Sequence, residues 1–141
     1  LEPGRYLTAD AGLLLTRVLY RKKTSKRRFI IVDAAMNDLA RPALYGAYHP
    51  IWPAKKTKGG QETADVVGPV CESGDFLGKS RLLPRCEPND LLAVLKCGAY
   101  GFAMSSQYNS RPRAAEVLVD GSRVRVVRRR ETMKDIVGAE R

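Results

Sequence analysis

The sequence has few cysteines and no long apolar run, and each absence excludes a class of protein. Three cysteines in 141 residues are an odd number without the spacing of a metal site, which argues against a disulfide framework and for a reducing compartment. No run approaches the roughly 18 apolar residues of a membrane span. The N-terminus also lacks the basic-then-apolar pattern of a signal peptide. We therefore expect no metal site and no membrane partner.

Motifs of nucleic-acid binding are missing too, although the net charge of +10 invites that function. About half of the 25 Lys and Arg residues fall in two clusters, Arg17 to Arg28 and Arg123 to Lys134. The first cluster lies where a hairpin would turn, and the second alternates with valines along a predicted strand. Because there is no RNA-binding aromatic strand, zinc-finger spacing or recognition helix, we favour solvated charge. A basic β module that binds nucleic acid stays as an alternative.

What is present is the composition of one soluble domain, with 44% hydrophobic and 28% charged residues. The chain begins at Leu1 without a methionine, and we expect it to be a piece of a longer protein. Short apolar runs with frequent turn signals predict a mainly antiparallel β domain. The predicted strands are 13–20, 29–32, 48–52, 64–70, 90–96, 116–119 and 123–127.

Turn and capping residues complete this outline. Asp120-Gly121 is a good hairpin signal, and residues 21–28 are predicted to form a longer hairpin connection. The stretch 131–137 is predicted to be a terminal helix that ends at Gly138. Residues 75–88, where leucines mix with charges and prolines, are predicted to be irregular.

Three short stretches carry candidate chemistry. The Glu-Pro-Gly-Arg corner at 2–5 combines free N–H groups with a cation, which suits a phosphate. Within residues 36–45, Arg41 and Tyr45 would share one face of a short helical turn. In the turn 68–75, Cys71 precedes a carboxylate, which opposes thiolate formation and suits a cysteine that donates a proton. Taken alone, each stretch is better explained by an ordinary turn, a surface arginine or a buried loop cysteine.

Four separated strings together resemble the diaminopimelate decarboxylase family of barrel-type, alanine racemase-like pyridoxal-phosphate decarboxylases. They cover most of the chain in the right order. Ala35, where the family usually has Gly, and Cys97, usually a smaller residue, are departures outside the expected chemistry. The strings are EPGR at 2–5, VDAAMNDLARPALYGAYH at 32–49, GPVCESGDFLGK at 68–79 and GAYGFAMSSQYNSRPRAAEVLVDG at 98–121.

The resemblance implies a mainly β fold: the antiparallel β-sandwich or Greek-key-like C-terminal domain of these enzymes, with short helices and a C-terminal helix. Residues 1–10 would be the end of the cofactor-binding α/β barrel and its link, and 11–141 the β domain. The rest of the barrel, with the lysine that binds the cofactor covalently, would lie upstream. The fragment alone is therefore expected to be inactive.

The resemblance also implies roles for individual residues around pyridoxal 5'-phosphate. Glu2 would face the pyridine nitrogen and keep it protonated, so that the ring serves as an electron sink. Gly4 and Arg5 would contact the phosphate, with Arg5 also near the distal carboxylate of the substrate. Tyr100 would touch both cofactor and substrate.

For the substrate, meso-diaminopimelate, Arg41 and Tyr45 would bind the distal carboxylate. Glu72 would bind the distal ammonium, and Cys71 would return a proton to the α-carbon after carbon dioxide leaves. In the family the Cys-Glu loop reaches into the partner's site, which implies a homodimer with shared active sites.

The related decarboxylases of ornithine or arginine are the other enzymes to consider. Their substrates lack the distal carboxylate and would leave Arg41 and Tyr45 unpaired. The sequence does not distinguish bacterial cytoplasm from plastid stroma.

Overall fold

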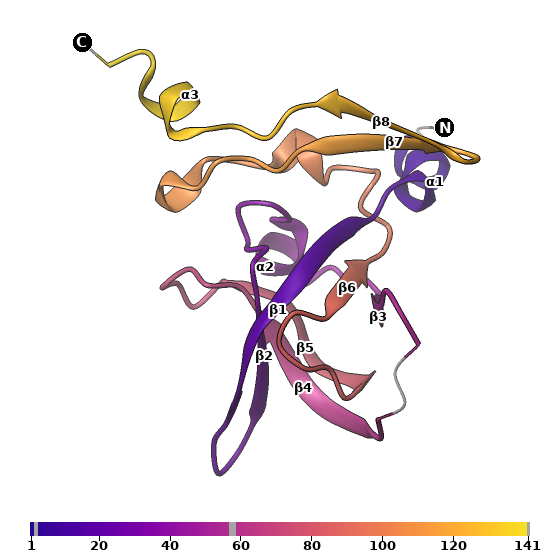
Figure 1. Cartoon of the computed structure of the whole chain (residues 1–141), viewed down its shortest axis with the longest axis vertical. Coiled ribbons are helices and arrows are strands. Elements are labelled where there is room, and N and C mark those ends of the chain that lie inside the picture. Colours follow the sequence, from indigo (N-terminus) through magenta and orange to yellow (C-terminus); the bar gives the residue numbers. More distant parts are fainter. Residues whose placement is uncertain (2, 57–58, 141) are drawn as a thin grey trace.

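The computed structural model describes residues 1, 3–56 and 59–140 and contains a six-stranded sheet, a two-stranded sheet and short helices (Figure 1). The large sheet is made of β1 (Leu14–Lys23), β2 (Arg28–Val32), β3 (Ile51–Pro53), β4 (Gln61–Val67), β5 (Phe76–Pro84) and β6 (Leu91–Val94). Strands β7 (Glu116–Asp120) and β8 (Arg123–Arg128) form the small sheet. The helical elements are α1 (Gly4–Thr8), η1 (Ala9–Ala11), α2 (Arg41–Tyr45), η2 (Phe102–Met104), η3 (Tyr108–Ser110) and α3 (Met133–Val137).

The six strands lie in the order β3-β6-β1-β2-β4-β5, and the sheet curls until its edges meet. The edge strands β3 and β5 contact each other, and a Cβ on Gly78 of β5 would lie 3.1 Å from Ile51 Cδ1 of β3. One curled sheet therefore surrounds the core. The buried core side chains include Val18, Ile30, Val32, Leu39, Val66, Leu77, Leu92 and Val94.

The mainly β architecture with few short helices is confirmed, with one pairing that the hairpin pattern does not predict. All pairs in the large sheet are antiparallel except β2 and β4, where Phe29, Ile30 and Ile31 run parallel to Asp65, Val66 and Val67. A parallel pair needs a long crossover. Here the crossover consists of residues 33–60 and contains both α2 and β3.

The prediction that residues 75–88 are irregular is wrong, because β5 occupies 76–84. Ser80 has a φ of 50°, and its N–H donates to Asp65 Oδ1 at 2.6 Å. The pairing with β4 shifts register beside it. This irregularity interrupts the two-residue alternation by which a strand is recognised in a sequence.

The two predicted hairpins are present. In β1–β2 the pairing continues to Lys23 opposite Arg28, so the strands take up half of the predicted connection. In β7–β8 the turn follows Asp120, with Gly121 at a φ of 57°. The predicted terminal helix is α3, whose Thr132 forms a capping box with Asp135.

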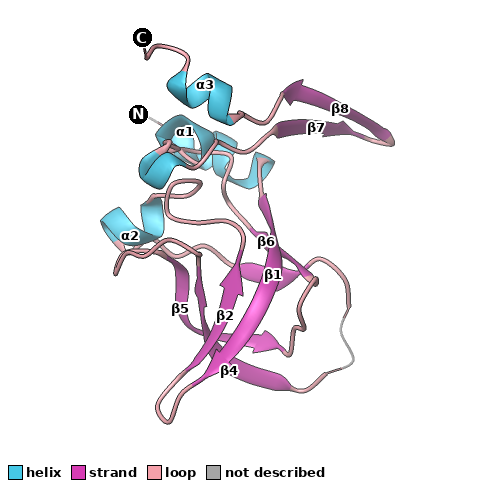
Figure 2. Ribbon diagram, turned by 60° about the vertical axis from the view of Figure 1, so that its left-hand side comes forward, coloured by secondary structure: helices cyan, strands magenta, loops and turns pink. Residues whose placement is uncertain are grey.

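The helices gather at one end of the six-stranded sheet, and the β1–β2 turn lies at the other end (Figures 1 and 2). None of the helices in the described part of the chain is long and apolar enough to cross a membrane. The end with the helices carries the predicted site residues.

Candidate active site

The N-terminal helix packs directly against the turn that carries Tyr100. A Cβ on Gly98 would lie 2.1 Å from the Thr8 carbonyl oxygen, so only glycine allows this backbone approach. The Gly98 N–H donates to the Ala9 carbonyl at 3.1 Å. The exposed Gly4 and Arg5 of α1 and the exposed Tyr100 therefore belong to two segments in contact.

At the corner 2–5 the chain enters α1 directly, with Pro3 at the N-cap and Gly4 as the first helical residue. Glu2, the predicted partner of the pyridine nitrogen, lies outside the described residues. Its role stays a prediction.

Arg41 lies between two tyrosine rings, and both belong to the predicted site. The guanidinium carbon is 5.6 Å from the ring centroid of Tyr45 and 5.4 Å from that of Tyr100. The first contact confirms the shared face expected from their spacing within α2. The second contact joins segments far apart in sequence. In the described part of the chain Arg41 makes no ion pair with a carboxylate, so its N–H groups are available for an anionic ligand.

The turn 68–75, with Cys71 and Glu72, is shaped by the buried carboxylate of Asp75. Its two oxygens accept hydrogen bonds from the N–H groups of Val70, at 2.6 Å, and Met36, at 2.8 Å. Burial raises the pKa of Asp75, although these two hydrogen bonds oppose the shift. The turn is thus fixed to the segment that leads into α2, while Cys71 and Glu72 at its tip are exposed.

Sequence analysis did not identify Tyr108, which the structure places beside Glu72. The Tyr108 hydroxyl donates to Glu72 Oε2 at 3.2 Å, and this hydrogen bond raises the pKa of the phenol. The Gly74 N–H donates to the other carboxylate oxygen of Glu72 at 3.3 Å. No spacing or pattern in the sequence links Tyr108 to Glu72; the only available signal was that Tyr108 lies in the fourth family-like string.

The loop that carries Tyr108 is anchored to the same segment as the Cys-Glu turn. Arg111 Nε donates to Asn37 Oδ1 at 3.0 Å, and another N–H of Arg111 donates to the Asp33 carbonyl. The Ser106 N–H donates to the Asn37 carbonyl at 2.9 Å, and Asn37 is buried. Residues 33–38 therefore position Tyr108, the Cys-Glu turn and α2 together.

The predicted residues fall into two groups at this end of the sheet. The Cys-Glu turn lies close to α2, because a Cβ on Gly74 would be 3.7 Å from Ala43 Cβ. Among the described residues, however, no hydrogen bond or ion pair joins Arg41, Tyr45 or Tyr100 to Cys71 or Glu72. The geometry provides one group made of the Arg41 guanidinium and the Tyr45 and Tyr100 rings, and one separate thiol–carboxylate group.

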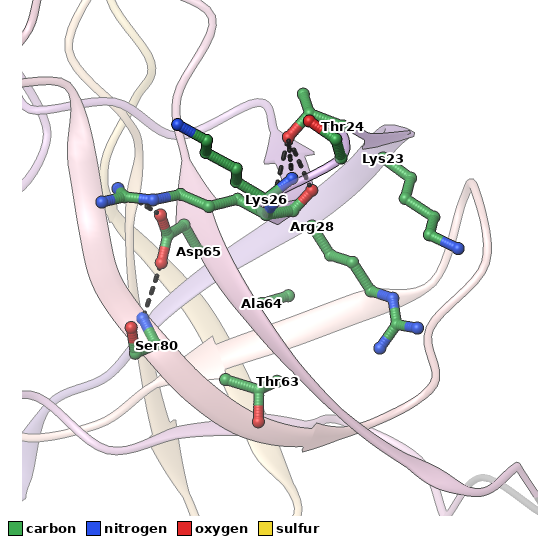
Figure 3. A pocket seen from close by; sticks show the side chains of 10 residues that line it. Lys23, Thr24, Lys26, Arg28, Thr63, Ala64, Asp65 and Ser80 are labelled. Carbon is green, nitrogen blue, oxygen red and sulfur yellow. Dashed lines mark hydrogen bonds and ion pairs between the residues drawn. The ribbon is translucent and has the colours of Figure 1, made fainter.

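The basic cluster of β1–β2 lies at the opposite end of the sheet and lines a pocket of about 410 Å³ (Figure 3). Acidic side chains partly neutralise it: Arg27 pairs with Asp65 at 3.4 Å, and Arg21 pairs with Glu62. None of the predicted site residues lines this pocket.

The described residues also contain no group of three or more His, Cys, Asp or Glu side chains that could hold a metal ion.

Comparison with known proteins defines the class. Residues 5–98 match the family model of the pyridoxal-dependent decarboxylases, C-terminal sheet domain. The chain belongs to this family of cofactor-dependent enzymes, of which it contains the C-terminal sheet domain.

Within that family the chain resembles the diaminopimelate decarboxylases. It is 54% identical over 140 residues to diaminopimelate decarboxylase of Neisseria meningitidis serogroup A, and 55% identical over 139 residues to that of Pseudomonas aeruginosa. The structure of Helicobacter pylori diaminopimelate decarboxylase complexed with L-lysine matches with a TM-score of 0.88 and 47% identity, over 95% of this chain and 33% of that one. The two sequence matches cover 99% of this chain but only 34% and 33% of the relatives, so the chain spans about a third of their length.

Proposed function

We propose that this chain is the C-terminal part of an enzyme that converts meso-2,6-diaminopimelate to L-lysine and carbon dioxide with pyridoxal 5'-phosphate. The observation that carries the proposal is Arg41 between the rings of Tyr45 and Tyr100, in a chain 54% identical to a diaminopimelate decarboxylase. Residues 1–10 are the end of the barrel and its link, and 11–141 the β domain. The enzyme is a homodimer of the bacterial cytoplasm or the plastid stroma.

Arg41 and Tyr45 select the substrate by its distal carboxylate. A planar guanidinium binds a carboxylate through two parallel hydrogen bonds, and the Tyr45 phenol adds one more. Ornithine has no distal carboxylate, so a site built around these donors leaves them unpaired. Such sites reject the analogue by about 10⁴ in kcat/KM in favourable cases.

The cofactor fits the donor set of the first group. The exposed Arg5 guanidinium suits its phosphate, the open space above Gly4 admits it, and Tyr100 offers a ring and a hydroxyl. Glu2 is assigned to the pyridine nitrogen. When bound, pyridoxal phosphate supplies an electron sink for the bond that breaks at the α-carbon.

The second group acts on the substrate of the partner subunit. Cys71 and Glu72 are exposed at the tip of a turn that is fixed by Asp75, which suits a loop that enters another chain. Glu72 binds the distal ammonium, and the Cys71 thiol donates its proton to the α-carbon. A two-fold dimer then makes two complete sites from two pairs of half-sites.

The substrate assignment is tested by assaying the full-length enzyme with meso-diaminopimelate and ornithine in parallel. We expect turnover of diaminopimelate and little of ornithine. Comparable kcat/KM values for the two substrates would overturn the assignment.

The shared site is tested with Cys71→Ala. We expect turnover to fall by roughly 10²–10⁴ while cofactor binding is retained. Ser73→Ala, an exposed neighbour in the same turn, is the matched control and should leave the rate near wild type. Heterodimers of Cys71→Ala subunits with subunits that lack the upstream lysine should regain activity, because one site then has both groups. Heterodimers that form but stay inactive would exclude a shared site.

A further inference from the structure

The strongest unassigned feature near the site is Tyr108, whose hydroxyl is directed at Glu72. Glu72 is exposed, and its carboxylate is nevertheless held at both oxygens, by the Tyr108 hydroxyl and by the Gly74 N–H. A carboxylate has about four lone-pair positions. Two are used here, so each oxygen keeps one position for a ligand donor.

Tyr108 is itself fixed by its surroundings. It begins η3, where Asn109 and Ser110 have φ values of 59° and 55°. Non-glycine residues rarely adopt such values, and two in succession need a surrounding structure that maintains them. That structure is the set of hydrogen bonds from Ser106 and Arg111 to residues 33–37.

The turn that carries Glu72 is anchored to the same segment through Asp75 and Met36. Donor and acceptor therefore have a common base, and the 3.2 Å contact joins two positioned loops. With an ordinary phenol pKa of 10, which the hydrogen bond to Glu72 raises further, the Tyr108 hydroxyl is protonated and so a donor at neutral pH.

We infer that Tyr108 is a positioning residue that orients the Glu72 carboxylate toward the distal ammonium of the substrate and so contributes to specificity for a diamino dicarboxylate. This inference rests on the proposed function. An ammonium with three N–H donors reaches the free positions of a carboxylate that is already oriented. Without the phenol, the Glu72 side chain samples several rotamers and must be ordered when substrate binds.

The test uses the full-length enzyme with its cofactor and the variant Tyr108→Phe, which removes one oxygen atom. For meso-diaminopimelate we expect KM to rise roughly 10- to 20-fold, the lower range for a hydrogen bond to a charged group, with little change in kcat. For 2-aminopimelate, which keeps both carboxylates but lacks the distal amine, we expect no change. Tyr20→Phe, at another exposed tyrosine far from the site in β1, is the matched control.

A double-mutant cycle separates positioning from a structural role. In a Glu72→Ala background, Tyr108→Phe should have no further effect on KM, because the carboxylate that it orients is gone. Equal effects of Tyr108→Phe with and without Glu72 would overturn the inference, as would an unchanged KM for diaminopimelate. A wild-type enzyme with no activity on diaminopimelate would instead overturn the proposed function, and the inference with it.

Discussion

In the six-stranded sheet Val66, Leu77 and Leu92 have no exposed surface, whereas every residue of β8 in the C-terminal region (residues 112–140) is exposed. Val117 and Val119 of β7 pair with Val126 and Val124 of β8, so the four valines share one exposed face. Ion pairs between Arg113 and Glu131, Arg128 and Glu116, and Arg129 and Asp135 hold this region. Apolar burial therefore stabilises the sheet, and charge pairing organises the C-terminal region.

The two regions also respond to pH in opposite directions. Burial raises the pKa of Asp75 and Asp38 beside the sheet, so their charged forms cost stability. Hydrogen bonds from Arg113 and Gln107 contribute to lowering the pKa of Glu131 to about 2, so its charged form contributes stability. Protonation by acid therefore stabilises the sheet region at Asp75 and Asp38. It destabilises the C-terminal region, where Glu131 loses the charge that its hydrogen bonds favour.

The largest effect is expected from one truncation made in both regions. Val66→Ala should lower the free energy of unfolding of the 141-residue chain by about 2–3 kcal/mol, the loss of two buried methyl groups plus a cavity. Val126→Ala removes the same atoms where 61% of the residue is exposed, and should cost less than about 0.5 kcal/mol. Denaturant unfolding measures both values. A similar loss at Val126 would show that the hairpin is buried in solution.

A somewhat smaller effect is expected from Asp75→Asn. An amide accepts well at one oxygen only, so the N–H of Val70 or Met36 loses its partner, at a cost of about 1–2 kcal/mol. Because the folded pKa of Asp75 is raised, the stability linked to its ionisation is present below the ordinary value of 3.8 and lost as pH rises through the raised value. Unfolding measured across pH should therefore show this slope in the wild type and not in the variant. An identical slope in both would contradict the assignment.

As the pH falls, the C-terminal region should lose its structure before the six-stranded sheet does. The stability that Glu131 contributes is complete above its ordinary pKa of 4.5 and is lost as pH falls through about 2. Methyl NMR spectra should show the valines of β7 and β8 changing environment in this range while Leu77 and Leu92 do not. Glu131→Gln should give the altered hairpin spectrum already at neutral pH. Simultaneous change in both regions would remove the distinction between them.

The smallest effect concerns the basic clusters, one in each region. Glu62 and Asp65 neutralise part of the first, and Glu116 and Asp135 part of the second. We expect only weak, sequence-independent binding to duplex DNA that disappears at moderate salt. Fluorescence anisotropy over a salt series measures this. A tight, sequence-selective complex at physiological salt would favour the nucleic-acid alternative.

Local patterns predicted the local parts of the fold. Both hairpins and the capped terminal helix follow from turn residues and apolar alternation, which act within a few residues. Strand β5 was missed because the irregular backbone at Ser80 breaks its alternation. The parallel pairing of β2 with β4 depends on the burial of distant side chains and has no local signal.

The candidate site shows the same division. The contact between Arg41 and Tyr45 follows from their spacing of four residues. The contact between Arg41 and Tyr100 and the hydrogen bond from Tyr108 to Glu72 join loops that only the folded sheet brings together. The sequence pointed to residue types, and tertiary structure decides which of them meet.

The crossover between β2 and β4 also has a consequence for how the chain folds. Residues 33–60 include α2, with Arg41 and Tyr45, and β3, which crosses to the opposite edge of the sheet and pairs with β6. Pairings between distant segments require loops to close before any contact forms, which slows folding. During synthesis, the contact between Arg41 and the ring of Tyr100 cannot form until the ribosome has released β6 and the turn with Tyr100, so this part of the surface takes shape only after most of the six-stranded sheet has been made.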